Sequence, residues 1–367
     1  MEEKVKNNER NYSLDLLRIF SIILIIVFHV CYKSLDFSKL TGLNQIIVGF
    51  FWHFGEIGVN LFMLITGYFL YKSEKNQKSK IIRLIYDIWI YYIFNIIILI
   101  FVKGGYTITY NALFPVSLGN FWYITSYIVI LLLAPYLNKL IKNLNYSEHK
   151  KLLIMFFIVF SLIPTISGLS IGTTENGVVY SRFAWLIYIY FLGAFISKYQ
   201  DKDKILIKNR KYFIKLLILL IVLLFGFMLA AKYLLVHKMP DLKINYMWPP
   251  NSVIVFLISL VIFIIFTKIS IVKQGLLTKI IKNTSPHVLG VYLFHDSPYN
   301  YVIFSEGIIW LNNLHAAKRL VPTIILISLA FFIAGLVISI IKKYTFDKIY
   351  QKIILKVDKK FNLQLSK

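Results

Sequence analysis

The chain alternates between long apolar runs and short segments rich in polar and basic residues. An α-helix rises 1.5 Å per residue, so about 20 apolar residues cross a hydrocarbon core of about 30 Å. The pattern therefore predicts an all-α, polytopic integral membrane protein with about ten transmembrane helices. The runs lie near residues 13–33, 43–70, 80–102, 118–141, 150–169, 181–197, 212–235, 250–268, 285–304 and 320–341.

Composition and charge agree with this prediction. Hydrophobic residues make up 58% of the chain and charged residues 16%, with a mean hydropathy of +0.69, which is far too apolar for a soluble protein of 367 residues. The net charge of +24 does not indicate nucleic acid, because 32 of the 41 Lys and Arg residues fall on one side of the predicted spans. Under the positive-inside rule both termini are cytoplasmic.

Two regions depart from a plain series of spans. Residues 43–70 contain Gly49, Gly55, Gly58 and Gly67, which predicts a broken or re-entrant helix. After a membrane-embedded domain at 1–341, residues 342–367 form a basic tail with apolar positions every three or four residues. We expect the tail to be an amphipathic helix on the anionic membrane surface, in contact with lipids.

The first run, "LDLLRIFSIILIIVFHV", carries ionisable residues that are costly in a bilayer. Arg18 and His29 are eleven positions apart, which on a helix leaves them on one stripe, offset by about 20° and about 16 Å along the axis. Asp15 shares that face and pairs with Arg18. An alternative without function remains: Arg18 snorkels to the headgroups while His29 bonds a neighbouring helix.

Further polar residues fall near the middle of other spans. His53, Glu56 and Asn60 are spaced by three and four on one helical face, and His295 lies in the ninth span. We expect these residues to line a shared polar cavity. Each histidine also has a simpler interpretation as a satisfied packing residue. A lone buried carboxylate such as Glu56 is harder to dismiss, because it is expensive unless protonated or paired.

These residue types indicate a chemistry. A buried neutral imidazole suits a general base, so His29 would deprotonate a hydroxyl. Arg18, Lys80 and Arg83 gather at the cytoplasmic ends of their spans, where they would bind the phosphates of a nucleotide-containing donor. Lys80 also fits ordinary positive-inside charge. The single cysteine, Cys31, excludes an intramolecular disulfide and a multi-cysteine metal site, and we expect no metal.

The sequence resembles the acyltransferase-3 family of membrane acyltransferases, which includes O-acetyltransferases of bacterial surface polysaccharides. The resemblance covers most of the chain. Thr66 stands where the family usually has serine, and Lys80 replaces the first arginine of a common Arg-x-x-Arg pair. The resemblance rests on the segments "LDLLRIFSIILIIVFHV", "GVNLFMLITGYFL", "KSKIIRLIYDIWIYY", "FWYITSYIVILLLAP" and "LGVYLFHD".

The resemblance implies a catalytic His29 with Arg18 as its basic partner. The expected enzyme moves an acyl group, acetyl in the first place, from cytoplasmic acyl-CoA to a hydroxyl of a cell-surface glycan or its lipid-linked precursor, in a bacterial plasma membrane. Acyl-CoA is then a donor substrate, and no cofactor is bound. Direct transfer and an acyl-enzyme intermediate both remain open, as does the acceptor. The alternative is a flippase or transporter of lipid-linked glycan, with the polar face lining its pathway.

Overall fold

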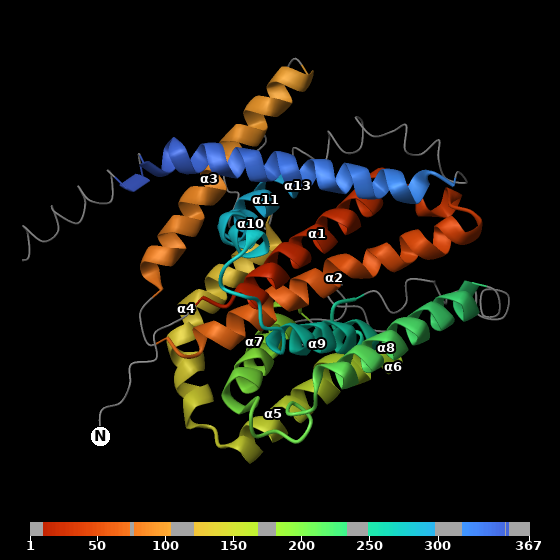
Figure 1. Cartoon of the computed structure of the whole chain (residues 1–367), viewed down its shortest axis with the longest axis vertical. Coiled ribbons are helices and arrows are strands. Elements are labelled where there is room, and N and C mark those ends of the chain that lie inside the picture. The colour runs from red at the N-terminus through yellow and green to blue at the C-terminus, as the bar shows by residue number, and fades with distance from the viewer. Residues whose placement is uncertain are drawn as a thin grey trace, which may run out of the picture.

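The computed structural model describes residues 10–73, 77–103, 121–167, 181–232, 249–297, 318–348 and 350–351, and all regular structure among them is helical. The helices form a bundle in which α1 and α2 run side by side through the middle (Figure 1). In order, the elements are α1 (Tyr12–Ser34), η1 (Phe37–Lys39), α2 (Gly42–Leu70), α3 (Lys78–Lys103), α4 (Trp122–Asn143), α5 (Tyr146–Phe157), η3 (Ile158–Leu162), α6 (Ile163–Ser167), α7 (Arg182–Tyr199), α8 (Arg210–Ala230), α9 (Val253–Thr267), α10 (Leu276–Thr284), η7 (Ser285–His287), α11 (Val288–His295) and α13 (Leu320–Tyr344).

Side-chain caps place the starts of several helices. The side chains of Asn11, Asn145, Ser181 and Asn209 each accept a hydrogen bond from a backbone amide in the first turn, at the starts of α1, α5, α7 and α8. Such caps satisfy amides that have no partner within the helix. Four short polar residues thus mark where apolar runs begin.

The structure confirms an all-α polytopic membrane protein. Every predicted run contains a helix, and most bounds agree within a few residues. In the described part of the chain, seven helical stretches are long and apolar enough to cross a membrane: α1, α2, α3, α4, α5 to α6, α8 and α13. The number ten stays a prediction. The ninth run is helical from Ser285 to His295, and its end beyond residue 297 lies outside the described residues.

The prediction of a broken second helix is wrong, because α2 is continuous from Gly42 to Leu70. Its glycines instead allow close packing. A Cβ atom on Gly67 would lie 2.1 Å from the backbone oxygen of Tyr190 in α7, and one on Gly193 of α7 would lie 2.3 Å from the backbone oxygen of Leu64. Small residues let membrane helices approach closely enough for backbone contact.

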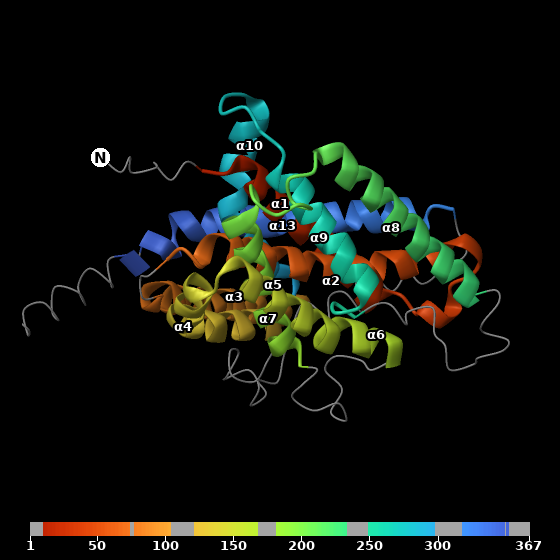
Figure 2. The same ribbon diagram turned by 90° about the horizontal axis from the view of Figure 1, so that it is seen from below.

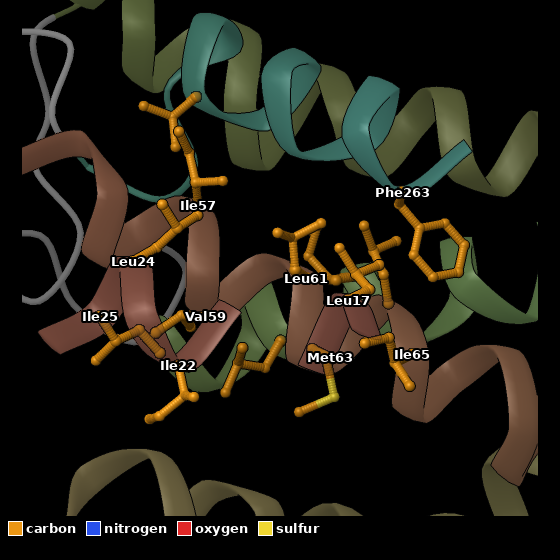
Figure 3. Packing of buried hydrophobic residues seen from close by; sticks show 14 of the residues in the cluster. Leu17, Ile22, Leu24, Ile25, Ile57, Val59, Leu61, Met63, Ile65 and Phe263 are labelled. Carbon is orange, nitrogen blue, oxygen red and sulfur yellow. The ribbon is translucent and has the colours of Figure 1, made fainter. Parts of the chain in front are cut away.

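Apolar side chains of α1, α2 and α9 fill the centre of the bundle (Figure 3). Leu17 and Ile22 of α1, Leu61 and Met63 of α2 and Phe263 of α9 are essentially inaccessible to solvent. The tight centre fixes α1 against α2, and these two helices carry most of the polar residues singled out in the sequence.

The start of α1 and the end of α13 lie at the same end of the bundle (Figure 1). α10 projects from the edge of the helical layer (Figure 2). The expected amphipathic tail falls mostly on residues 352–367, which lie outside the described residues.

Candidate active site

His29 forms the centre of a polar cluster near the C-terminal end of α1. Its Nδ1 atom lies 3.0 Å from Nε2 of His295 at the end of α11. His295 is completely buried, whereas the side chain of His29 retains 13% of its exposure. The structure therefore joins two histidines that are 266 positions apart in the sequence.

The hydrogen-bond chain behind this pair determines its tautomers. Nδ1 of His295 lies 2.9 Å from the carbonyl oxygen of Val291, and a carbonyl only accepts, so this nitrogen carries the hydrogen. In the neutral ring Nε2 of His295 is then an acceptor, and Nδ1 of His29 donates to it. The remaining nitrogen of His29, Nε2, is left with a free lone pair. That is the form required of a general base.

Asp296 and Lys33 flank the histidine pair. Nζ of Lys33 donates to Oδ1 of Asp296 at 3.0 Å, and the same oxygen lies 3.5 Å from Nδ1 of His29. All three side chains are mostly buried. A carboxylate at this distance stabilises the imidazolium that forms when His29 accepts a proton.

His29 lines a small cavity of about 220 Å³. Glu56 of α2, Trp122 of α4 and Arg182 of α7 contribute to the same lining. Oε1 of Glu56 lies 3.8 Å from Nη2 of Arg182, and the Arg182 guanidinium is 4.5 Å from the centroid of the Trp122 ring. The small cavity thus places a base, a carboxylate and a guanidinium around one space.

A large cavity of about 1800 Å³ lies toward the N-terminal end of α1. Four basic side chains, Arg10, Arg18, Lys72 and Lys80, are part of its lining. Asp15 accepts hydrogen bonds from both Arg10 and Arg18 and so neutralises only part of this charge. The large cavity is suited to an anionic ligand, with basic groups contributed by α1, by α3 and by the residues just before α1 and just after α2.

The two cavities meet at a shared wall formed by Ile25, Val59, Tyr123 and Tyr292. The rings of Tyr123 and Tyr292 meet edge to face, with their centroids 6.3 Å apart. His29 lines only the small cavity, and Arg18 and Lys80 line only the large one. The predicted separation of Arg18 from His29 along α1 corresponds to two spaces divided by this wall.

The expected donor site of Arg18, Lys80 and Arg83 is only partly assembled. Nζ of Lys80 donates to the Tyr127 hydroxyl within the lining of the large cavity. Arg83 does not line this cavity. It pairs with Asp87 at 3.2 Å and with Asp347 after the end of α13. The prediction for Arg83 therefore needs correction, because its guanidinium ties α3 to the C-terminal segment.

The prediction of a shared polar cavity also needs correction for two residues of α2. Asn60 donates to the Pro250 carbonyl at 2.9 Å and accepts from the indole nitrogen of Trp185 at 2.9 Å. His53 is fully buried and its Nδ1 atom lies 2.9 Å from the Gly49 carbonyl. Neither residue lines either cavity, and both serve packing.

Sequence reasoning missed Lys33 and Arg182 as site residues and passed over the role of Asp296. For each of the three, the sequence contains a feature that could have indicated a place in the site. Lys33 lies one helical turn after His29, Asp296 follows His295 directly, and Arg182 is one of the nine basic residues outside the cytoplasmic groups. The positive-inside count treated these basic residues as background charge.

Comparison with known proteins adds one match. The model of the acyltransferase-3 family, described as an acyltransferase domain, matches residues 11–344, which include every residue that lines the small cavity and all but Arg10 of those that line the large one. No curated protein and no solved structure matches the chain.

Proposed function

Because the chain belongs to the acyltransferase-3 family and is an acyltransferase embedded in a membrane, we propose that it moves an acyl group, acetyl in the first place, from cytoplasmic acyl-CoA to a hydroxyl of an extracytoplasmic or lipid-linked glycan. The observation that carries the proposal is the position of His29, which lines the small cavity, one wall away from the basic large cavity, while its Nδ1 atom is engaged by His295 and its Nε2 lone pair is available. Family membership favours this function over a flippase. A bacterial plasma membrane is the proposed location.

The large cavity supports the part of the proposal that concerns the donor. Acyl-CoA carries several phosphate charges at one end and its thioester at the end of a thin, flexible arm. Arg18 and Lys80 would hold phosphates, with the planar guanidinium of Arg18 able to bind two oxygens at once. The arm would then pass the shared wall and present the thioester to His29, about 16 Å from Arg18 along α1.

His29 would act as general base in direct transfer. Its Nε2 atom takes the proton of the acceptor hydroxyl while the hydroxyl oxygen attacks the thioester carbonyl carbon. The carbon–sulfur bond breaks, the acceptor becomes an ester, and the imidazolium gives its proton to the CoA thiolate. Asp296, 3.5 Å from Nδ1, stabilises the imidazolium between these two transfers.

An acyl-enzyme route uses the same nitrogen. Nε2 of His29 would attack the thioester carbon, and the carbon–sulfur bond would break with CoA leaving as its thiolate. The acceptor hydroxyl would then attack the acyl carbon and break its bond to Nε2, which takes the hydroxyl proton and passes it to the CoA thiolate. Both routes require the tautomer that the contact with His295 selects. Trapping of a labelled acyl group on His29 in the absence of acceptor would distinguish the second route from the first.

The test is the replacement His29→Ala in the full chain, reconstituted in lipid nanodiscs with acetyl-CoA and a glycan acceptor. General base catalysis contributes roughly 10²–10⁴-fold, so kcat for CoA release and for ester formation should fall at least 100-fold. His149→Ala is the matched control, because His149 lies against the Phe191 carbonyl and lines neither cavity. Transfer at the wild-type rate by folded His29→Ala would refute the proposal.

A further inference from the structure

The small cavity holds charged groups that the transfer step itself does not use. Glu56 and Arg182 face each other across it, whereas the reaction needs only His29, His295 and Asp296. We propose that Glu56 and Arg182 form the binding site for a single neutral sugar ring of the acceptor, with one ring hydroxyl donating to Glu56 and accepting from Arg182. The inference rests on the proposed function and specifies its acceptor.

The Glu56 side chain is short of partners where it stands. Only 5% of it is exposed, and its Oε2 atom is buried with no hydrogen-bond partner among the described residues. Its other oxygen is 3.8 Å from Arg182, which is longer than a hydrogen bond. A desolvated carboxylate with so few donors is costly, and a ligand hydroxyl that donates to Oε1, the oxygen nearer Arg182, would lower that cost.

Arg182 supplies the complementary donors. Its guanidinium lies over the Trp122 ring, and its charged partner among the described residues, Glu56, is 3.8 Å away, beyond hydrogen-bond distance. A hydroxyl group both donates and accepts, so it satisfies a carboxylate and a guanidinium together. Because the two groups are 3.8 Å apart, one hydroxyl beside them on the cavity side can lie within hydrogen-bond distance of both.

Charge in the small cavity favours a neutral ring. Lys33 pairs with Asp296, and Arg182 faces Glu56, so the four charged groups cancel. An anionic ring would bring a second negative charge toward Glu56 in a space with little water, where like charges repel strongly. The large cavity differs, because its basic groups outnumber Asp15.

Size and surface chemistry fit a single ring. A volume of about 220 Å³ lies below the range of about 300–1,000 Å³ for drug-sized ligands, so the cavity suits a ligand no larger than one monosaccharide unit and is too small for an oligosaccharide. The aromatic side chains of Tyr32 and Tyr123 also line the cavity and give it apolar surface beside its charged groups. The longer glycan would extend outward from the cavity.

The test compares acceptors and variants of the full chain in nanodiscs with acetyl-CoA. Wild type should acetylate methyl glycosides of a neutral hexose or an N-acetylhexosamine with kcat/KM at least tenfold above that for a methyl hexuronate. Glu56→Gln and Arg182→Lys should each raise KM for the neutral acceptor about tenfold or more, the loss expected for a hydrogen bond to a charged group. KM for acetyl-CoA should stay within about twofold, because the donor phosphates bind in the other cavity.

Controls separate this inference from the proposed function. Glu148→Gln, at the exposed start of α5, should leave acceptor KM unchanged. Folded Glu56→Gln and Arg182→Lys proteins with wild-type acceptor KM would overturn the inference. So would a wild-type preference for the hexuronate, or acetyl-CoA hydrolysis with no transfer to any hexose derivative. A wild-type protein that neither hydrolyses acyl-CoA nor transfers from it would instead refute the proposed function.

Discussion

His295 determines which nitrogen of His29 is available as a base. The Val291 carbonyl fixes the hydrogen on Nδ1 of His295, and the remaining lone pair of His295 holds the hydrogen on Nδ1 of His29. The result is a chain of two hydrogen bonds that ends at the reacting nitrogen. His295 is a positioning residue, since it lines neither cavity and reaches the substrate only through His29.

Replacing His295 tests this role. In His295→Asn the shorter side chain no longer reaches Nδ1 of His29, so the imidazole loses its fixed tautomer and orientation. We expect kcat to fall about tenfold to 100-fold while KM for acyl-CoA is unchanged. His295→Gln, whose amide oxygen can accept from His29, should recover part of the rate. Equal losses in the two variants, or a change in donor KM alone, would contradict a positioning role.

Spacing along one helix predicted some of these residues and misled on others. The rotation between Arg18 and His29 predicts one stripe along α1, and in the structure each of the two residues lines a different cavity. The same reasoning grouped Asn60 with Glu56 and Arg83 with Lys80. Spacing shows which residues share a face of their own helix, but the neighbouring helix determines the partner, and for Arg83 that partner is Asp347.

At the scale of helices, α2 is held against α7 by glycines, which have no side chain to keep the two backbones apart. Gly67 and Gly193 permit backbone contact between α2 and α7, and these two helices supply Glu56 and Arg182 to the small cavity. The sequence predicted a break here because glycine lowers helix propensity. Long-range packing decides otherwise, and no feature of the α2 sequence alone reports where α7 lies.

The α2–α7 contact can be tested by adding one methyl group. In Gly67→Ala the new Cβ would overlap the Tyr190 backbone oxygen, and such overpacking costs about 1–3 kcal/mol. We therefore expect a lower unfolding temperature in detergent. Gly226→Ala in α8 is the matched control, since nothing lies within 4 Å of its Cβ position, and it should be neutral or slightly stabilising. Equal melting temperatures for the two variants would show that the contact carries no stability.

Across the whole molecule, the two cavities draw their basic residues from the two groups that the positive-inside rule assigns to opposite sides of the membrane. Arg10, Arg18, Lys72 and Lys80 of the large cavity belong to the groups assigned to the cytoplasm, whereas Lys33 and Arg182 of the small cavity belong to the nine outside them. This division can be predicted from the sequence, because the charge of the loops indicates orientation. The cavities cannot be predicted in this way, since they form between helices that are distant in the chain.

Single-cysteine labelling tests the orientation. Cys31 is the only cysteine and is buried, so it gives little background. We expect Lys39→Cys, in η1 beyond α1, to react with a membrane-impermeant maleimide in intact cells. Lys279→Cys, exposed on α10, should react only after permeabilisation. The reverse pattern would place the large cavity outside the cell and remove its access to cytoplasmic acyl-CoA.

The shared wall of Ile25, Val59, Tyr123 and Tyr292 has a consequence for what the cell loses during acyl transfer. On the proposed function, a group activated in the cytoplasm leaves through the protein while its nucleotide carrier stays behind. Only the acyl group then crosses the membrane, and CoA remains in the cytoplasm for reuse. Two aromatic rings and two aliphatic side chains filling the passage would also limit ion leakage, so that glycan modification proceeds without discharging the proton gradient.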